Sequence, residues 1–433
     1  MKMLCLAVVV LFAAPGWGEE GATFRGDLSH SGVYPGGGVA SPVAVKWKFK
    51  TNGQVLSSPA VIDGTLYVGS TDHTLYAIDQ RTGTEKWRFK TGGRVTSSPA
   101  VVAGSVYFGS YDGNFYAVSA ATGKLRWKYQ TEGERRFSAK HLHGMQPAAE
   151  TMPDPFDVYL SSPSVWNDWV YFGSGDHNVY ALSVASGELK WKFATGNVVH
   201  ASPAIADGTL YIGSWDSYFY AIDAQNGHLK WRFKTGDDPV ISNQVGIQSS
   251  AAVANGLVYF GCRDSNLYAL DAATGAKRWS FANHGSWVVG SPAAKEGKLY
   301  FATSDSGMFQ AVDAATGVQL FSLKLKWPMF SSPTIAGGML YIGSHEGKLF
   351  AINLVNKSVA WVFQTDASKS NGARYTSADG GPNYAAAMTD DFYDETIQGI
   401  GRMMSVGAIL SSPVVVQGAL YFGSTDGYIY ALG

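Results

Sequence analysis

The sequence is poor in cysteine and in charged residues. Its cysteines are Cys5 and Cys262, and Cys5 falls in an N-terminal apolar run that we expect to be removed. No internal disulfide can then form, so stability must come from packing. Charged residues make up 15% of the chain and the formal net charge is -1. Because no sequence-wide field attracts phosphates or anionic lipid, we expect no nucleic-acid partner.

Long hydrophobic runs are also scarce. Lys2, the apolar run at 4–14 and the small residues up to Gly18 are typical of a secretory signal peptide at residues 1–18. No later segment approaches eighteen uninterrupted apolar residues, so we expect no transmembrane anchor. The sequence therefore predicts an exported, soluble protein in the periplasm or outside the cell.

Glycine and an internal repeat are abundant. Glycine occurs 51 times in 433 residues, above its usual share. A Tyr-x-Gly-Ser element, sometimes degraded, recurs with a basic period of about forty residues, at Tyr67, Tyr107, Tyr171, Tyr211, Tyr259, Tyr300, Tyr341 and Tyr421. Each unit contains four short strand patterns separated by turns such as Asp-Gly and Thr-Gly, which is the pattern of a propeller blade.

The outermost strand pattern, Trp-x-Phe, gives the number of blades. It occurs at Trp47, Trp87, Trp127, Trp191, Trp231, Trp279 and Trp361, with Phe321 in place of tryptophan once. The last unit stops at Gly433 without this strand, whereas an unassigned copy stands at 46–49. The sequence therefore predicts an all-β, eight-bladed β-propeller of four-stranded antiparallel blades, with the last blade closed by the N-terminal strand. We expect residues 19–433 to form this single domain as a monomer.

The run Leu75-Tyr76-Ala77-Ile78-Asp79, followed by Thr82, Gly83 and Trp87, resembles the repeat of the pyrroloquinoline quinone (PQQ)-like propeller superfamily. This superfamily includes PQQ-dependent alcohol dehydrogenases and a periplasmic propeller lipoprotein of the outer-membrane assembly machine, so the resemblance implies a fold more than an activity.

The two kinds of member imply different sites. A dehydrogenase would hold a quinone disc and Ca²⁺ in the central channel, usually beside two adjacent cysteines, but Cys262 stands alone and no Cys-x-x-Cys-His motif occurs. The assembly factor would carry a lipidated cysteine after its signal sequence, which this chain lacks. Our primary hypothesis is a non-catalytic propeller, such as an envelope assembly or scaffold factor, that binds a protein or other ligand. The alternative is a PQQ-dependent oxidoreductase with Asp237 or Asp238 as its base.

Three insertions interrupt the repeat, at about 131–159, 236–248 and 366–409. Each lies between a Trp strand and the next Ser-Pro strand, so all three emerge on one face of the ring, which we call the upper face. Long loops in a compact ring are usually functional lids or mobile segments. Apolar residues between Met388 and Met404 predict a weakly amphipathic short helix that either caps the ring or fills the core.

Blades four to six depart from the shared pattern on the same face. At the top of the innermost strand most blades have an apolar residue or threonine, but blade four has His200 and blade five has Gln248. An aromatic surface, a guanidinium and converging amides suit a planar or anionic ligand, and the candidates for binding it are His200, Trp215, Asp237, Asp238, Asn243, Gln244, Gln248, Arg263 and Trp287. His141 and His143 are secondary candidates, because two histidines on an irregular loop are a weak ligand pattern. The competing interpretation is architectural: surface side chains often only cover apolar area, and the ligand site would then lie in the last insertion.

Overall fold

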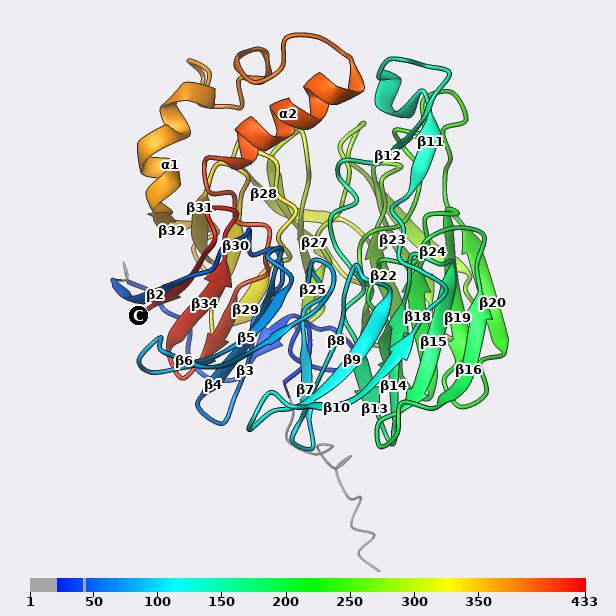
Figure 1. Ribbon diagram of the computed structural model, residues 1–433. Helices are drawn as coiled ribbons and strands as arrows, with labels where there is room; N and C mark the ends of the chain where they lie inside the picture. The colour runs from blue at the N-terminus through cyan, green and yellow to red at the C-terminus, as the bar shows by residue number, and fades with distance from the viewer. Residues whose placement is uncertain (1–21, 42–43) are drawn as a thin grey trace, which may run out of the picture.

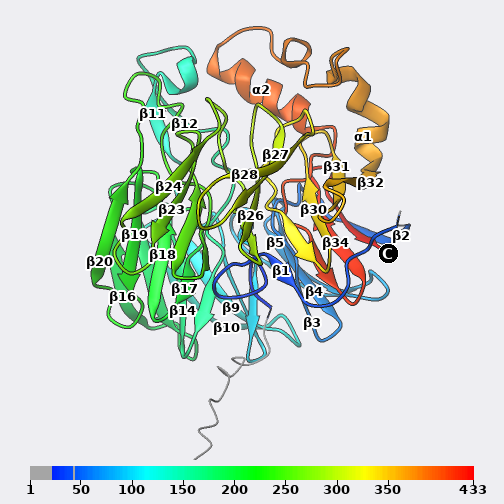
Figure 2. The same ribbon diagram turned by 180° about the vertical axis from the view of Figure 1, so that it is seen from behind.

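Eight small β-sheets are arranged around a central axis in the computed structural model, which describes residues 22–41 and 44–433 (Figure 1, Figure 2). The predicted signal peptide and Cys5 lie outside the described residues. Seven sheets have four strands and one has five, and all pairings within the blades are antiparallel except for one added edge strand. The predicted eight-bladed propeller is confirmed.

Blades are numbered from the first complete repeat. Blades one to three contain β3 (Ala60–Ile62), β4 (Thr65–Ser70), β5 (Thr74–Asp79), β6 (Glu85–Lys90); β7 (Ala100–Val102), β8 (Ser105–Gly109), β9 (Asn114–Ser119), β10 (Leu125–Gln130); and β13 (Ser164–Trp166), β14 (Trp169–Gly173), β15 (Asn178–Ser183), β16 (Leu189–Ala194). Blades four to six contain β17 (Ala204–Ala206), β18 (Thr209–Gly213), β19 (Tyr218–Asp223), β20 (Leu229–Lys234); β21 (Ala252–Ala254), β22 (Leu257–Gly261), β23 (Asn266–Asp271), β24 (Lys277–Ala282); and β25 (Ala293–Lys295), β26 (Lys298–Ala302), β27 (Met308–Asp313), β28 (Gln319–Lys324). Blade seven contains β29 (Thr334–Ala336), β30 (Met339–Gly343), β31 (Lys348–Asn353) and β32 (Ser358–Gln364), with β1 (Val33–Tyr34) on its inner edge; blade eight contains β33 (Val414–Val416), β34 (Ala419–Gly423), β35 (Tyr428–Leu432) and β2 (Val45–Lys50).

The ring is closed by its N-terminal strand. β2 pairs antiparallel with β35, with Trp47 opposite Ala431. The Trp47 side chain is buried against Tyr421 and donates its indole N–H to the carbonyl of Gln80, at 3.0 Å. The orphan strand pattern in the sequence therefore completes the last blade, as predicted, and leaves no open edge there.

A second closure surrounds the channel. In every blade the backbone N–H of one serine near the innermost strand donates to the side-chain oxygen of the matching serine in the next blade, at 2.8–3.3 Å. The eight serines are Ser58, Ser98, Ser162, Ser202, Ser250, Ser291, Ser332 and Ser412. This cycle gives the repeated Ser-Pro element a physical role, because each blade satisfies a buried backbone donor of its neighbour.

The glycine of the last turn in each blade fits the tryptophan of the blade before it. Gly83 has a φ of +73°, and a Cβ built there would lie 2.6 Å from the Trp47 ring. Blade seven carries Lys357 instead, with a φ of +54°, and the blade before it carries Phe321 in place of tryptophan. The smaller ring removes the steric reason for glycine, so the two exceptions in the repeat explain each other.

The N-terminal segment covers the lower mouth of the channel, which the sequence did not reveal (Figure 2). Carbonyl groups of residues 28–32 accept backbone hydrogen bonds from the innermost strands of blades four to seven. The fully buried Arg25 donates to the carbonyls of Pro333 and Pro292, at 2.6 and 3.0 Å. His30, also buried, lies beside it. The channel is therefore closed from below by the chain itself.

Candidate functional site

Two of the insertions stand side by side above the ring (Figure 1). The first contains β11 (Ser138–Lys140), η1 (Leu142–Gly144) and β12 (Thr151–Pro153); the third contains α1 (Asp366–Asn371), η2 (Gly372–Tyr375), η3 (Tyr384–Ala386) and α2 (Tyr393–Met404). α2 is the short helix that the apolar pattern predicted. The Tyr393 hydroxyl at its start donates to the carbonyl of Pro153, at 2.8 Å, so the two insertions are in direct contact.

Arg263 is the centre of a buried cluster that holds the first insertion. Its side chain is fully buried, and its guanidinium lies 3.7 Å from the Trp287 ring centroid and 4.7 Å from that of Trp215. Nη1 donates to Oδ2 of Asp154, an insertion residue, at 2.9 Å, and Nε2 of His143 is 2.9 Å from the same oxygen. Burial opposes ionisation of Asp154, but Arg263 and His143 outweigh it and lower the pKa of this carboxyl to about 2. Within the chain, the Arg263 guanidinium thus pairs with Asp154 and packs against the rings of Trp215 and Trp287.

His200 is the centre of a second buried cluster. Its Nδ1 lies 2.6 Å from Oδ1 of Asp157 and its Nε2 lies 2.8 Å from Oε1 of Glu134. Burial disfavours the charged imidazole, but the two carboxylates outweigh that penalty and raise the pKa of His200 to about 10. Burial raises the pKa of Glu134, whose carboxylate also accepts from the backbone N–H of Gly175 at 2.5 Å. A charged histidine therefore joins blade four to both ends of the first insertion.

The segment between these two clusters lies across the upper mouth of the channel. The Phe156 ring packs edge-on against Trp287 and Phe330, and its carbonyl accepts from Nε2 of Gln248 at 2.9 Å. On the other side the Tyr159 hydroxyl donates to the carbonyl of Leu410 in blade eight, at 3.0 Å. The channel mouth is therefore spanned by residues of the first insertion.

The other candidates are placed nearer to solvent. Oδ1 of Asn243 accepts a hydrogen bond from Nδ1 of His143, at 2.8 Å, so Asn243 lies against the first insertion. Asp238 accepts backbone N–H groups of its own loop, at 3.1–3.3 Å, and Asp237 is exposed, 3.5 Å from the Lys234 ammonium. Gln244 and His141 are half-buried on the same face. No cluster of three His, Cys, Asp or Glu side chains suited to a metal occurs in residues 22–41 and 44–433.

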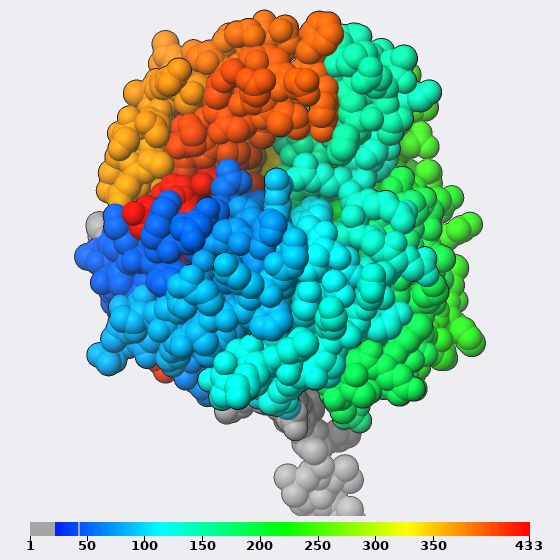
Figure 3. All heavy atoms as spheres, viewed as in Figure 1, coloured from blue at the N-terminus to red at the C-terminus, as the bar shows by residue number. Residues whose placement is uncertain are grey.

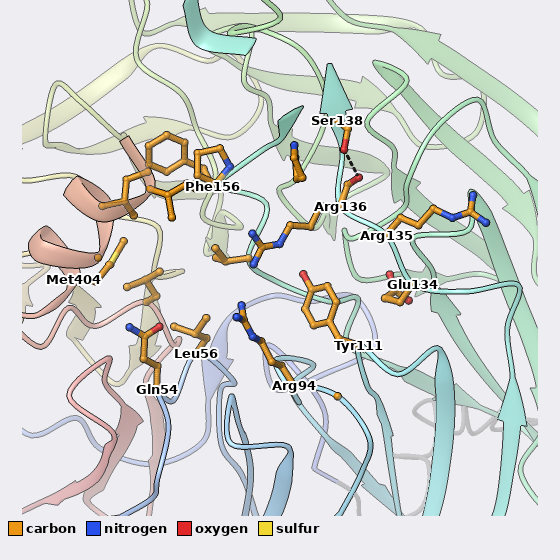
Figure 4. A pocket seen from close by; sticks show the side chains of 18 of the residues that line it. Gln54, Leu56, Arg94, Tyr111, Glu134, Arg135, Arg136, Ser138, Phe156 and Met404 are labelled. Carbon is orange, nitrogen blue, oxygen red and sulfur yellow. Dashed lines mark hydrogen bonds between the residues drawn. The ribbon is translucent and has the colours of Figure 1, made fainter. Parts of the chain in front are cut away.

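A cavity of about 1160 Å³ opens between the two insertions, above blades one to three and eight (Figure 3). Ile397, Ile400 and Met404 of α2 line one part, together with Leu56 and Leu410. Arg94, Arg135, Arg136, Tyr111 and Glu134 line another part. In the close-up, Arg94 and Arg136 extend toward one another and Arg135 points away from them (Figure 4).

Sequence comparison among the repeats missed this basic side. Arg94 stands two residues before the top of an innermost strand, where blade one has Gln54 and blade four has Val198. A comparison of the residues at the top of each innermost strand does not include this position and therefore does not identify Arg94. Arg136 lies in an insertion without a counterpart in any other blade, so no repeat comparison identifies it.

The fold and its closed channel define a PQQ-like propeller, and comparisons with known proteins agree. A family model described as outer membrane protein assembly factor BamB matches residues 40–149, 157–286 and 263–390. The chain belongs to this family. No curated protein matches it.

Solved structures show the same fold at low sequence identity. BamB from Moraxella catarrhalis is 16% identical, with a TM-score of 0.63, covering 90% of this chain and 98% of its own. The quinohemoprotein alcohol dehydrogenase from Comamonas testosteroni is 14% identical, with a TM-score of 0.69, covering 95% of this chain and 80% of its own. A europium-containing methanol dehydrogenase is also 14% identical, with a TM-score of 0.69, covering 95% and 98%. Within the part of the chain that the structure describes, no helix is long and apolar enough to cross a membrane.

The quinone and Ca²⁺ that the resemblance to PQQ-dependent dehydrogenases implies do not fit the channel mouth of this chain. Phe156 and Tyr159 occupy that region with contacts to blades on both sides. The carboxylates beside them, Asp154 and Asp157, are engaged by Arg263, His143 and His200. Of the described residues, these two carboxylates at the mouth are therefore already paired and are not free to bind a cation.

Proposed function

We propose that the protein is an exported, non-catalytic propeller that binds a protein or small ligand in the cavity on its upper face. One observation carries this proposal: insertions that leave the ring after blades two and seven meet above it and border a cavity of about 1160 Å³. Binding sites are usually concave, with an apolar lining and a few placed polar groups, and this cavity has both.

The buried candidates take a supporting role in this proposal. Arg263, Trp215 and Trp287 hold the first insertion on the ring, and His200 holds the segment next to the cavity. Gln244 and the other half-exposed candidates on this face remain available for direct contact with a partner. Recognition then depends on the shape of the insertions, which the buried clusters maintain.

The matched family supports a binding role, because its model is described as an outer membrane protein assembly factor. An envelope assembly or scaffold role in the periplasm is therefore the more specific form of the proposal.

The oxidoreductase alternative is supported by the fold shared with a quinohemoprotein alcohol dehydrogenase and a methanol dehydrogenase. Titration of the purified chain with PQQ and Ca²⁺, followed by visible absorption and by dye-linked alcohol oxidation, separates the two functions. We expect no turnover. Stoichiometric PQQ binding with alcohol oxidation would make the oxidoreductase function primary.

Site-specific photocrosslinking tests the binding face. A photoreactive phenylalanine analogue replaces Ile397, at the cavity, or His228, an exposed residue of the turn on the opposite face, in cells that produce the full chain. We expect adducts, measured by intact mass, from position 397 and not from position 228. Equal labelling from both positions, or labelling from 228 alone, would contradict the proposed face.

A further inference from the structure

The cavity on the upper face is chemically divided. Three side chains on one face of α2, Ile397, Ile400 and Met404, give it an apolar wall, and Ile397 is 37% exposed there. The opposite wall carries the guanidinium groups of Arg94 and Arg136 (Figure 4). The apolar side chains of α2 and the two guanidinium groups therefore lie on different sides of the cavity.

The two arginines have no anionic partner of their own. Among residues 22–41 and 44–433, the ion pairs within 4.0 Å include neither Arg94 nor Arg136. The one carboxylate that lines the cavity, Glu134, is already bound by His200 and by the N–H of Gly175. Two like charges that converge without a counterion are stabilised by an anion placed between them.

Tyr111 adds a neutral donor beside them. Burial, together with the charge of Asp157, raises the pKa of Tyr111, so its hydroxyl keeps its proton. This hydroxyl lies 3.4 Å from the carbonyl of Asp157, a long contact that a stronger acceptor can replace. The basic wall therefore offers guanidinium and hydroxyl donors to one small acidic group.

From this division we infer that the cavity binds an amphiphilic anion, a molecule with a carboxylate or phosphate head group on an apolar body. The head group lies between Arg94 and Arg136, and the body lies along Ile397, Ile400 and Met404. Guanidinium groups bind carboxylate and phosphate with paired hydrogen bonds, and burial of the apolar body supplies the rest of the affinity. The inference rests on the proposed function and specifies the class of ligand.

Fluorescence titration with 1-anilinonaphthalene-8-sulfonate, an amphiphilic anion, tests this on the full chain, with decanoate and decyl phosphate as competitors. We expect saturable binding and displacement by one or both competitors, and which of them displaces better distinguishes a carboxylate from a phosphate ligand. Decanol has the apolar body without an anionic head group, and inorganic phosphate has the anionic group without an apolar body. Each should therefore displace the fluorescent anion at least about tenfold more weakly than the better of the two anionic competitors. Displacement by decanol as good as by decanoate would overturn the inference.

Matched variants locate the site. Arg94→Gln and Arg136→Gln should each weaken decanoate binding about tenfold or more, whereas Arg232→Gln, at an exposed position of blade four outside the cavity lining, should change it less than about twofold. Ile397→Ala should weaken decanoate, and Phe392→Ala, an exposed residue of the same insertion outside the cavity lining, should not. Arg94→Lys keeps the charge if Arg94→Gln proves unstable. Equal effects of Arg94→Gln and Arg232→Gln would refute the site.

The outcomes separate the two proposals. Crosslinks from position 397 to a protein, with no binding of any amphiphile, would refute the ligand class and leave the binding face intact. Neither crosslinks nor amphiphile binding would refute both.

Discussion

Loss of the Arg263 charge should release the first insertion while leaving the ring folded. In Arg263→Met the carboxylate of Asp154 stays fully buried without its main counterion, whose Nη1 is 2.9 Å away in the native protein. Breaking a buried pair by removing one partner costs about 3–5 kcal/mol. The insertion can avoid this penalty by leaving the ring, so the penalty appears as local opening of residues 131–159 rather than as global unfolding.

Hydrogen exchange measures this opening directly. The N–H of His143 donates to the carbonyl of Ile241, outside the first insertion, at 2.7 Å, and the N–H of Glu132 donates to Oδ2 of Asp176 in blade three, at 2.8 Å. These bonds protect both amides only while the insertion is seated on the ring. Since every 1.4 kcal/mol is tenfold in an equilibrium constant, exchange in peptides of 131–159 should accelerate by about two to three orders of magnitude. Peptides of β5 in blade one should exchange at the native rate.

Two controls make the test specific. Arg232→Met removes an arginine that also lies over an aromatic ring, 4.7 Å from the centroid of Tyr218, but that is exposed to solvent, and it should leave exchange in 131–159 unchanged. The double variant Arg263→Met/Asp154→Asn has no uncompensated charge and should regain much of the protection, with a coupling of at least about 2 kcal/mol. Exchange in Arg263→Met at the rate of Arg232→Met, or additive effects in the double variant, would refute the role given to this pair.

Two further predictions concern the ring. A chain without residues 19–50 loses β2 and the segment below the channel. Because burial of Trp47 alone is worth about 3–5 kcal/mol, the melting temperature of this chain should fall by more than about 10 °C. An unchanged melting temperature would contradict closure by the N-terminal strand. Burial lowers the pKa of His345 to about 4, so between pH 6.5 and 4 the unfolded chain binds more protons and the free energy of unfolding should fall as pH falls. In urea titrations His345→Asn should reduce this slope by about 1.4 kcal/mol per pH unit, and His228→Asn, at an exposed site, should not; equal slopes in the two variants would refute the assignment.

The fold was predictable because its determinants repeat. The Trp strands, the turn glycines and the unassigned copy at 46–49 give the blade count and the closure by counting alone. Even the exception at Lys357 follows from local sterics once Phe321 is seen to precede it by one blade. Residues that recur in the repeat, such as the Trp strands and turn glycines, make contacts between neighbouring blades. Because these contacts repeat around the ring, the residues that make them recur at a constant spacing in the sequence.

The site was only partly predictable, because an insertion has no periodic counterpart. The residues that break the pattern in blades four and five, such as His200 and Arg263, were recognised, but their partners Glu134, Asp154 and Asp157 lie in irregular sequence more than forty residues away. A polar residue that departs from the repeat indicates that its blade makes a contact that the other blades lack. It does not indicate whether that contact is with a ligand or with another part of the same chain.

The buried clusters and the cavity are nevertheless one system. Glu134 is held by His200, and Arg136, which forms the basic wall, follows it by two residues. Phe137, the next residue, stacks on Trp215 at 4.6 Å between ring centroids, and the same ring lies under Arg263. Arg136 therefore sits between two fixed points of the insertion, so its position in the cavity depends on both buried clusters. Variants in either cluster should then weaken binding in the cavity without any contact with the ligand, and this effect separates positioning residues from residues that touch it.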